Sequence, residues 1–594
     1  MQLNEQQEKA ASIFEGPLLI IAGAGSGKTR VLTERLARML EAGITRPEEI
    51  LLVTFTNKAA GEIKERVAKR IAVGKYIPWA GTFHSIAVKI LRRDIEHLGI
   101  NSNFTIYDGD DQLALVKQIM KERNISLTDH NPRAILGTIS NAKSELIKPK
   151  EFSREADGYF QELVAEIYEA YQKGLRANTA LDFDDLLVLT VELLENHPQV
   201  REKYQQNFSH VMVDEYQDTN HVQYRMVKLL AEPQNNICVV GDDDQSIYGW
   251  RGANVRNILE FEHDFSGAQV IKLEQNYRST KKILQAGNEV VKGVSGRKSK
   301  QLWTENGDGE NITLYEALDE KDESFWVAEM VDNLTDRGID PEEIVVLYRI
   351  NAQSRALEEA FMKTGIAYRI VGGIKFYERK EVKDMLAYLR IIHNPADELS
   401  LLRVINVPSR KIGAKTISSL WEKAASLGIS PLDYIAEQGL EEKSGIQQFA
   451  KLIRLLRTEQ ESKNVVDLIH SIAEKSGYID MLNDGTEQGK MRIENIQELI
   501  TVATKYQQLE PAESLQAFLE EVALVEASTE KDNPSTVSRG EGDESTGKRS
   551  AVTLMTAHGA KGLEYEHVFI IGLEEGIFPH SRALSNATEV DEER

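Results

Sequence analysis

The chain has 594 residues, 41% of them apolar and 28% charged, which is enough sequence for several domains with their own cores. Its net charge of −23 argues against a protein that coats nucleic acid through bulk positive charge, although a local basic groove or stacking platform remains compatible. The single cysteine, Cys238, excludes a disulfide framework and fits a reducing cytoplasm, and neither a membrane span nor a secretory leader is predicted.

A glycine-rich loop follows the first apolar run. Residues 18–21 predict a buried strand, a helical pattern follows residue 29, and between them stand Ala22, Gly23, Ala24, Gly25, Ser26, Gly27, Lys28 and Thr29. Such a loop cradles phosphates with backbone N–H groups and a helix N-terminus, while the lysine reaches the terminal phosphates and the Thr29 hydroxyl suits Mg²⁺. Ala22 replaces the glycine of the strict pattern, and we expect one methyl group to be tolerated there. The loop predicts a nucleoside triphosphate site, and a plain flexible turn is the alternative.

Further short apolar runs alternate with helical patterns, which predicts an α/β fold with parallel sheets flanked by helices. The runs of the first set are 50–55, 211–213, 237–240 and 270–273, and those of a second set are 312–315, 344–348, 552–555 and 568–571. Residues 85–207 and 376–525 are mostly helical in pattern, so each core is expected to carry a helical insertion. Residues 526–550 are polar and almost without apolar side chains, which predicts a disordered linker.

An acidic pair follows the run 211–213. Asp214 and Glu215 stand where a parallel strand ends, and ligands bind at that edge of a parallel sheet. Asp214 is expected to hold Mg²⁺, because hard cations prefer carboxylate oxygens. Glu215 is expected to orient or deprotonate the attacking water. Adjacent carboxylates also occur on ordinary surfaces, so this assignment depends on the phosphate loop.

A polar turn at residues 241–251 follows the next apolar run. Gln245 is placed to sense a terminal phosphate. Tyr248, Trp250 and Arg251 present two rings and a cation, which suit base stacking and phosphate contact. Ordinary packed aromatic side chains are the alternative for this segment.

These motifs occur in the order found in superfamily 1 DNA helicases, and the chain closely resembles the UvrD/Rep/PcrA group. The matching segments are 3–7, 22–29, 53–60, 81–85, 182–187, 214–218, 241–251, 273–279 and 552–564, and the resemblance spans residues 3–594. It implies two RecA-like P-loop cores. The implied limits are 1–84 with 208–278 for the first core, 85–207 for its insertion, 279–375 with 551–594 for the second core, and 376–525 for the accessory domain.

The resemblance also implies ATP and Mg²⁺ as cofactors and assigns roles to matching residues. Gln7 would recognise adenine, Tyr277 would stack on the base, and Glu564 would approach the ribose. Arg30 and Arg278 would contact the nucleotide, with Arg278 neutralising charge on the γ-phosphate beside the catalytic groups of Lys28, Glu215 and Gln245. The single-strand track would comprise Phe55, Asn57, His84, Phe183, Tyr248, Trp250 and Arg251.

The implied function is an ATP-dependent 3′–5′ helicase and single-stranded DNA translocase in repair or replication restart. Its partners would be single-stranded DNA, junctions with duplex, and repair or replication proteins, with no membrane. Because the chain ends at Arg594, before the family's last motif and its arginine, we expect a truncated second core and weak ATP hydrolysis. The alternatives are a nucleotide-gated single-stranded DNA-binding protein without efficient motor activity and a helicase subunit of a recombination nuclease complex.

Overall fold

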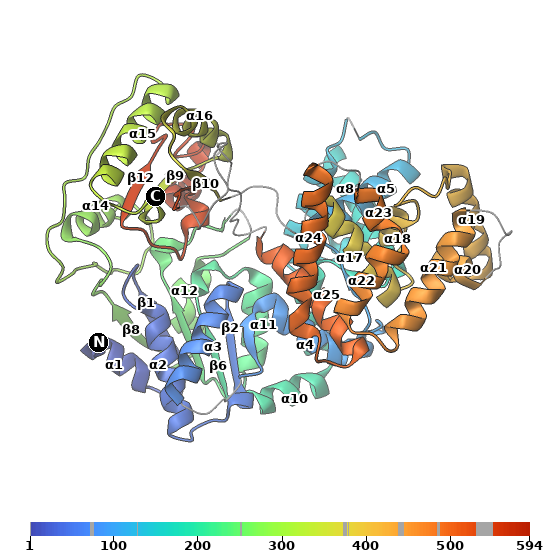
Figure 1. Cartoon of the computed structure of the whole chain (residues 1–594). Coiled ribbons are helices and arrows are strands. Elements are labelled where there is room, and N and C mark those ends of the chain that lie inside the picture. The colour runs from blue at the N-terminus through green and yellow to red at the C-terminus, as the bar shows by residue number, and fades with distance from the viewer. Residues whose placement is uncertain are drawn as a thin grey trace. The chain divides into compact units, whose positions relative to one another are not determined.

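The structure is a computed structural model that describes residues 2–71, 77–127, 129–249, 252–371, 377, 379–437, 445–483, 487–529, 550–581 and 583–594. The chain forms two compact units (Figure 1). Unit 1 comprises Met1–Ile86, Pro198–Lys375 and Thr529–Arg594, and unit 2 comprises Ala87–His197 and Phe376–Ser528.

A six-stranded parallel sheet forms the first core of unit 1, in the order β3-β2-β6-β7-β1-β8. The strands are β1 (Leu18–Ala22), β2 (Ile50–Thr54), β3 (Ala80–Thr82), β6 (His210–Val213), β7 (Ile237–Gly241) and β8 (Gln269–Leu273). Every residue of β1, β2, β6 and β7 is buried. Strands covered on both faces need apolar side chains at successive positions, which explains their unbroken apolar runs.

Helices α1 (Glu5–Ser12), α2 (Lys28–Glu41) and α3 (Asn57–Ile71) cover one face of this sheet (Figure 1). Leu32 and Leu36 of α2 join Ile20 of β1 in one apolar core. Strands β6, β7 and β1 are consecutive neighbours, so the segments that follow them meet at one edge of the sheet. The remaining helices of this core are α10 (Pro198–Asn207), α11 (His221–Ala231), α12 (Arg256–Leu259) and α13 (Phe261–Asp264).

A second parallel sheet of four strands follows the order β10-β11-β9-β12. Its strands are β9 (Ile344–Tyr348), β10 (Tyr368–Ile370), β11 (Val552–Thr556) and β12 (His567–Ile570). The helices of this part of the chain are α14 (Lys281–Val291), α15 (Glu320–Asp336), α16 (Ser354–Thr364) and α26 (Ala587–Glu593). Val327 of α15 and Phe361 of α16 pack with β9 and β11 in its core. The two parallel sheets confirm the predicted α/β class.

The prediction of a strand at residues 312–315 is wrong. The structure has no regular element there, and Ile312 and Leu314 are 61% and 89% exposed. An apolar run becomes a strand only when a neighbouring strand accepts its backbone hydrogen bonds, and no such partner lies beside it in the described part of unit 1. Conversely, β3 and β10 were missed because three residues are too few to show a pattern.

The described part of unit 2 is helical apart from a two-stranded sheet of β4 (Thr105–Ile106) and β5 (Ala180–Leu181). Helix α4 (Phe83–Asp94) begins in unit 1 and ends in unit 2. The other helices of unit 2 are α5 (Gly109–Glu122), α6 (Pro132–Ser144), α7 (Pro149–Glu155), α8 (Tyr159–Ala177), α9 (Phe183–Asn196), α17 (Lys380–His393), α18 (Glu398–Val404), α19 (Ala414–Leu427), α20 (Pro431–Glu437), α21 (Gly445–Gln460), α22 (Val465–Lys475), α23 (Tyr478–Leu482), α24 (Glu487–Ala503) and α25 (Pro511–Thr529).

Hydrogen bonds join the two segments of unit 2. Asn394 Nδ2 donates to Thr105 Oγ1 at 2.8 Å, and the Tyr107 hydroxyl donates to Asp397 Oδ1 at 3.1 Å. The domain limits expected from the sequence stay predictions. Helix α25 continues to Thr529, so the first residues of the expected linker 526–550 are helical, and residues 530–549 lie outside the described residues. No described helix is long and apolar enough to span a membrane.

Candidate nucleotide and DNA site

The loop between β1 and α2 has no room for side chains at its glycines. A Cβ on Gly25, where φ is +63°, would lie 2.6 Å from Asn276 Nδ2, and one on Gly23 would lie 2.1 Å from Leu302 Cδ2. Gly27 precedes α2 with φ of +85°. Since the first N–H groups of a helix lack partners within it, this tight loop with α2 behind it fits a phosphate group.

Burial and hydrogen bonds fix the other residues of the loop. Ala22 is the last residue of β1 and is fully buried in the core, so its methyl group is accommodated. The Ala24 carbonyl accepts a hydrogen bond from Asn276 Nδ2 at 2.7 Å, and Ser26 Oγ donates to the Gly23 carbonyl at 2.7 Å. Thr29 and Arg30 follow Lys28 in the first turn of α2, and both are half-buried.

Lys28 meets two of the predicted catalytic residues. Its Nζ donates a hydrogen bond to Gln245 Oε1 at 3.2 Å and lies 3.7 Å from Glu215 Oε1. Burial disfavours the ammonium ion, but surrounding carboxylates outweigh this and raise the pKa of Lys28; they belong to Glu215, Asp242, Asp214 and Asp218. The phosphate loop, the acidic pair and the polar turn thus converge on one lysine.

The two carboxyl groups of the acidic pair have pKa values shifted in opposite directions. Burial and the adjacent charge of Glu215 raise the pKa of Asp214 to about 7. Burial alone would raise the pKa of Glu215, but the positive charges of Lys28 and Lys561 outweigh this effect and hold the pKa of Glu215 below its usual value. Glu215 has a left-handed backbone, with φ of +51°, which turns the chain directly after β6. The carboxylate of Asp214 and the hydroxyl of Thr29 are hard oxygen donors, so this donor set fits Mg²⁺.

Lys561 is a member of this cluster to which the sequence assigned no role. It follows β11 of the second sheet, and its Nζ donates to the Gln245 carbonyl oxygen at 2.6 Å and pairs with Asp218. Burial raises the pKa of Asp218 to about 6, and Lys561 opposes that rise. Lys561 stands inside the matching segment 552–564, but only the tertiary structure brings it to the acidic motif.

Gln7 and Tyr277, the residues expected around adenine, lie beside the phosphate loop. Gln7 is fully buried; its Oε1 accepts from the Asn4 backbone N–H at 3.0 Å, and its Nε2 donates to the Ser26 carbonyl at 2.9 Å. Asn4 Nδ2 also donates to the Tyr277 hydroxyl at 2.9 Å, and the Tyr277 N–H donates to the Gly25 carbonyl at 3.0 Å. The two side chains are therefore brought together on one flank of the loop.

Arg278 and Glu564 form an ion pair between the two sheets of unit 1. Arg278 Nε lies 2.6 Å from Glu564 Oε2, and both side chains are substantially exposed, at 44% and 69%. The Arg278 Cβ lies against Gly25 of the phosphate loop. The arginine expected at the γ-phosphate is thus near the loop, with its guanidinium bonded to the residue expected at the ribose.

Part of the expected DNA track forms an aromatic cluster in unit 1. The rings of Phe55 and Tyr248 are parallel, with centroids 6.1 Å apart, and Phe83 lies edge-on to Phe55 at 6.5 Å. His84 follows Phe83 in α4, and Lys561 Nζ lies 5.0 Å from the Tyr248 ring centroid. The cluster joins the end of β2 to the polar turn after β7.

The other expected track residues are placed less completely. Asn57 is the first residue of α3, and Phe183 is the first residue of α9 in unit 2. Trp250 and Arg251 lie outside the described residues.

Family models match nearly the whole chain. Residues 3–266 match the UvrD/REP helicase N-terminal domain, and residues 271–594 match the UvrD-like helicase C-terminal domain. The chain belongs to the UvrD/Rep helicase family. The ATP-dependent DNA helicase PcrA of Bacillus subtilis strain 168 is 47% identical over 599 residues, which cover 100% of this chain and 80% of that relative. PcrA of Staphylococcus aureus strain Mu50 is 47% identical over 602 residues with the same coverage.

These comparisons confirm the family resemblance inferred from the motifs. The C-terminal family model matches through residue 594, and the expectation of a truncated chain gains no support. Weak ATP hydrolysis and the two alternative functions are likewise unsupported.

Proposed function

We propose that this chain is an ATP-dependent DNA helicase that translocates 3′–5′ on single-stranded DNA, with ATP as substrate and Mg²⁺ as metal. The observation that carries the proposal is the position of Gln245. Its side chain accepts a hydrogen bond from Lys28 of the phosphate loop, and its carbonyl oxygen accepts one from Lys561 of the second sheet. One residue thus links the nucleotide loop to the part of unit 1 that must move for a motor.

The chemistry assigned to the cluster is attack of water on the γ-phosphorus, with cleavage of its bond to the β–γ bridging oxygen. Glu215 accepts the proton of the attacking water, and its lowered pKa keeps it in the ionised form that can accept a proton at neutral pH. Lys28 and Arg278 stabilise negative charge on the phosphate oxygens. Thr29 and Asp214 would hold Mg²⁺, which when bound neutralises charge on the β- and γ-phosphates.

The aromatic cluster suits a strand that moves past it. Stacking on the half-buried Phe55 is tolerant of sequence because every base has a π-face, and the Tyr248 ring, which is 8% exposed, packs parallel to Phe55 and supports it. Tyr248 lies three residues beyond Gln245 in the same turn, so a change at the nucleotide reaches the cluster through a short covalent path. The 3′–5′ direction, the roles of Gln7, Tyr277 and Glu564, action in repair or replication restart, repair or replication proteins as partners, and a cytoplasmic location rest on the family resemblance.

Purified chain tests the proposal directly. ATP hydrolysis should require Mg²⁺ and increase with single-stranded DNA, and a duplex with a 3′ single-stranded tail should be unwound faster than one with a 5′ tail. Lys28→Ala is the control that should abolish both activities. DNA binding without hydrolysis, or unwinding that prefers a 5′ tail, would contradict the proposal.

A further inference from the structure

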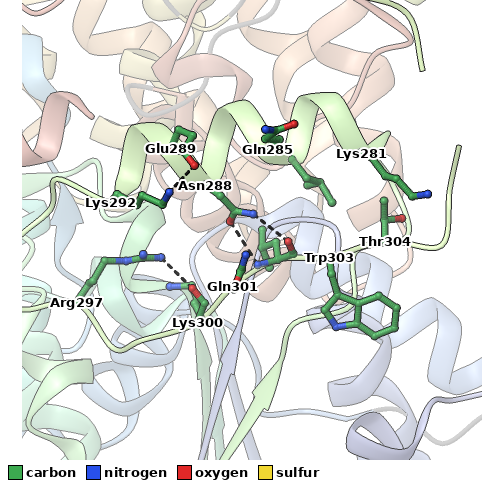
Figure 2. Close-up of a pocket in the computed structure, with 12 residues that line it drawn as sticks. Lys281, Gln285, Asn288, Glu289, Lys292, Arg297, Lys300, Gln301, Trp303 and Thr304 are labelled. Atoms are coloured by element: carbon green, nitrogen blue, oxygen red, sulfur yellow. Dashed lines mark hydrogen bonds and ion pairs between the residues drawn. The ribbon is translucent and has the colours of Figure 1, made fainter. Parts of the chain in front are cut away.

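A buried lysine outside the nucleotide cluster holds the turn that carries Gln245. Lys300 Nζ lies 2.7 Å from Asp242 Oδ1 and 2.8 Å from Asp244 Oδ2, and it also pairs with Asp243. Its side chain is only 1% exposed. Figure 2 shows Lys300 and Arg297 on one extended segment beside α14, with Arg297 hydrogen-bonded to the Lys300 carbonyl. One ammonium group therefore contacts three successive aspartates.

Asp242 is the member of this set that touches Gln245. Its Oδ2 accepts a hydrogen bond from Gln245 Nε2 at 2.6 Å, and its Oδ1 accepts from the Asp244 N–H at 3.2 Å, which caps the short helical turn Asp243–Gln245. An amide has a donor end and an acceptor end. Because the Gln245 donor is bound to Asp242, its acceptor faces the Lys28 ammonium; a flipped amide would point N–H groups at that cation.

The carboxylate of Asp242 is 2% exposed, and a buried charge is retained only when it is paired. Lys300 supplies that pairing. Arg297 adds a two-pronged contact to Asp244, with Nε at 2.9 Å and Nη2 at 2.5 Å from its two carboxylate oxygens. The Lys298 N–H donates to Asp243 Oδ2 at 2.7 Å. Segment 297–300 thus fixes every aspartate of the turn.

The same segment continues to the phosphate loop. Leu302 packs so closely on Gly23 that a Cβ there would require the Leu302 side chain to shift, and the Trp303 carbonyl accepts a hydrogen bond from the Asn276 N–H at 2.7 Å. Asn288 of α14 also bonds to the backbone of Leu302 in both directions: its Nδ2 donates to the Leu302 carbonyl at 2.9 Å, and its Oδ1 accepts from the Leu302 N–H at 3.3 Å. Residues 297–303 therefore contact the turn at residues 242–245, the phosphate loop and the motif at residues 273–279.

We propose that Lys300, assisted by Arg297, is a positioning residue that orients the Gln245 amide toward Lys28 through Asp242. This inference rests on the proposed function, because it assigns Gln245 a part in ATP turnover. Displacing the Lys300 ammonium from its position among the three carboxylates frees Asp242, and the Gln245 amide then loses its fixed orientation. A small displacement of a reacting constellation costs up to about 100-fold in rate.

The test compares Lys300→Arg, Lys300→Met and the matched control Lys292→Met in this chain. Lys292 is 64% exposed and pairs only at the surface with Glu289, so its variant should keep wild-type turnover. For Lys300→Arg, which keeps the charge but cannot centre one nitrogen among three carboxylates, kcat with single-stranded DNA should fall by about 10- to 100-fold. The KM for ATP should stay within about threefold, because Lys28 and the loop are intact.

A double-mutant cycle with Gln245→Ala separates positioning from general damage. If Lys300 acts through Gln245, Lys300→Arg should add no further loss of kcat in the Gln245→Ala background. Losses that multiply, or a Lys300→Arg variant equal to Lys292→Met, would overturn the proposal. If Lys300→Met does not fold because it strands buried carboxylates, Lys300→Arg decides alone. A wild-type chain without DNA-stimulated turnover would contradict the proposed function itself, which distinguishes the two failures.

Discussion

Lys561 Nζ donates a hydrogen bond 2.6 Å long to the carbonyl oxygen of Gln245. The same ammonium group pairs with Asp218 and lies 5.0 Å from the Tyr248 ring. Lys561 follows a strand of the four-stranded sheet, whereas its three partners follow strands of the six-stranded sheet. A displacement of one sheet relative to the other must therefore break or remake contacts at the turn that carries both Gln245 and Tyr248 of the aromatic cluster.

Lys561→Met should uncouple DNA binding from ATP turnover. The variant keeps side-chain length but removes the cation shared by Asp218, Gln245 and Tyr248, and coupling between two sites is worth about 5- to 150-fold. We expect the stimulation of kcat by single-stranded DNA to decrease by about 5- to 150-fold, which is a larger loss than that of basal hydrolysis, where Lys561 acts on the pKa of Glu215. Steady-state hydrolysis with and without oligonucleotide measures it, and Lys281→Met serves as the exposed control. Unchanged stimulation would rule out this coupling.

Glu215→Gln should abolish turnover while leaving nucleotide binding intact. The substitution is nearly isosteric but cannot accept a proton, and loss of a general base lowers rates by about 10²- to 10⁴-fold. The affinity for ATP should be preserved, since Lys28 and the loop backbone are unchanged. Single-turnover hydrolysis measures the rate of the chemical step, and equilibrium binding of a fluorescent nucleotide measures the affinity. A kcat within threefold of wild type would assign the base to another group.

The nucleotide motifs could be located from sequence because each stands directly after an apolar run. Asp214 after β6 and Gln245 after β7 are placed by the rule that ligands meet the carboxyl edge of a parallel sheet. Lys561 and Lys300 could not be found this way. Lys561 pairs with Asp218, which is 343 residues away in the sequence, and Lys300 pairs with Asp243, which is 57 residues away. In the sequence alone, a single lysine in a polar segment usually indicates a solvent-exposed surface.

The expected strand at residues 312–315 failed for a related reason. Its apolar side chains gave the right local pattern, but strand formation also needs a neighbour, and sequence pattern does not supply one. Tyr315 instead stacks on Trp326 of α15, with ring centroids 4.6 Å apart. Apolar runs therefore located the four- and five-residue strands of the two parallel sheets, but they missed the three-residue strands β3 and β10 and predicted one strand where no sheet is present.

Phe55→Ala should weaken binding of single-stranded DNA. Removing one stacking ring costs about 1–3 kcal/mol per base, which corresponds to roughly 5- to 150-fold in Kd. The loss should be similar for oligo(dT) and mixed sequences, because stacking does not read base edges. Fluorescence anisotropy of labelled oligonucleotides measures it, and Tyr159→Ala, which removes a ring that is 70% exposed in unit 2, is the aromatic control. Equal affinity for wild type and Phe55→Ala would remove Phe55 from the track.

Unit 2 should lose stability in mild acid because of His393. Burial, with the nearby charge of Arg92, lowers the pKa of His393 from 6.5 to about 4. A histidine that is harder to protonate when folded contributes stability above its unfolded pKa, and this is lost as pH falls from about 6.5 toward 4. The full loss is about 3 kcal/mol for this shift. Thermal unfolding at pH 7 and pH 4.5 should show a smaller acid-induced decrease for His393→Gln than for wild type. If wild type and His393→Gln lose the same stability between pH 7 and pH 4.5, His393 is not the cause of the acid destabilisation.

Lys143→Met should strongly destabilise unit 2. Lys143 is 1% exposed, and its Nζ lies 2.6 Å from Asp182 Oδ2 and 2.8 Å from Asp185 Oδ1. Removing one partner of a buried pair strands the other charges and costs about 3–5 kcal/mol. For a unit of this size the midpoint of thermal unfolding should fall by roughly 10 °C.

The position of this pair makes the loss specific. Asp182 caps α9 by accepting the Asp185 N–H at 2.8 Å, so the pair also fixes the start of the helix where Phe183 stands. Adding Asp185→Asn to Lys143→Met removes one stranded carboxylate and should recover part of the lost stability. Lys173→Met, at a pair whose lysine is 74% exposed, should leave the midpoint within about 1 °C, since surface pairs contribute little. If Lys143→Met and Lys173→Met unfold alike, the buried pair does not support α9.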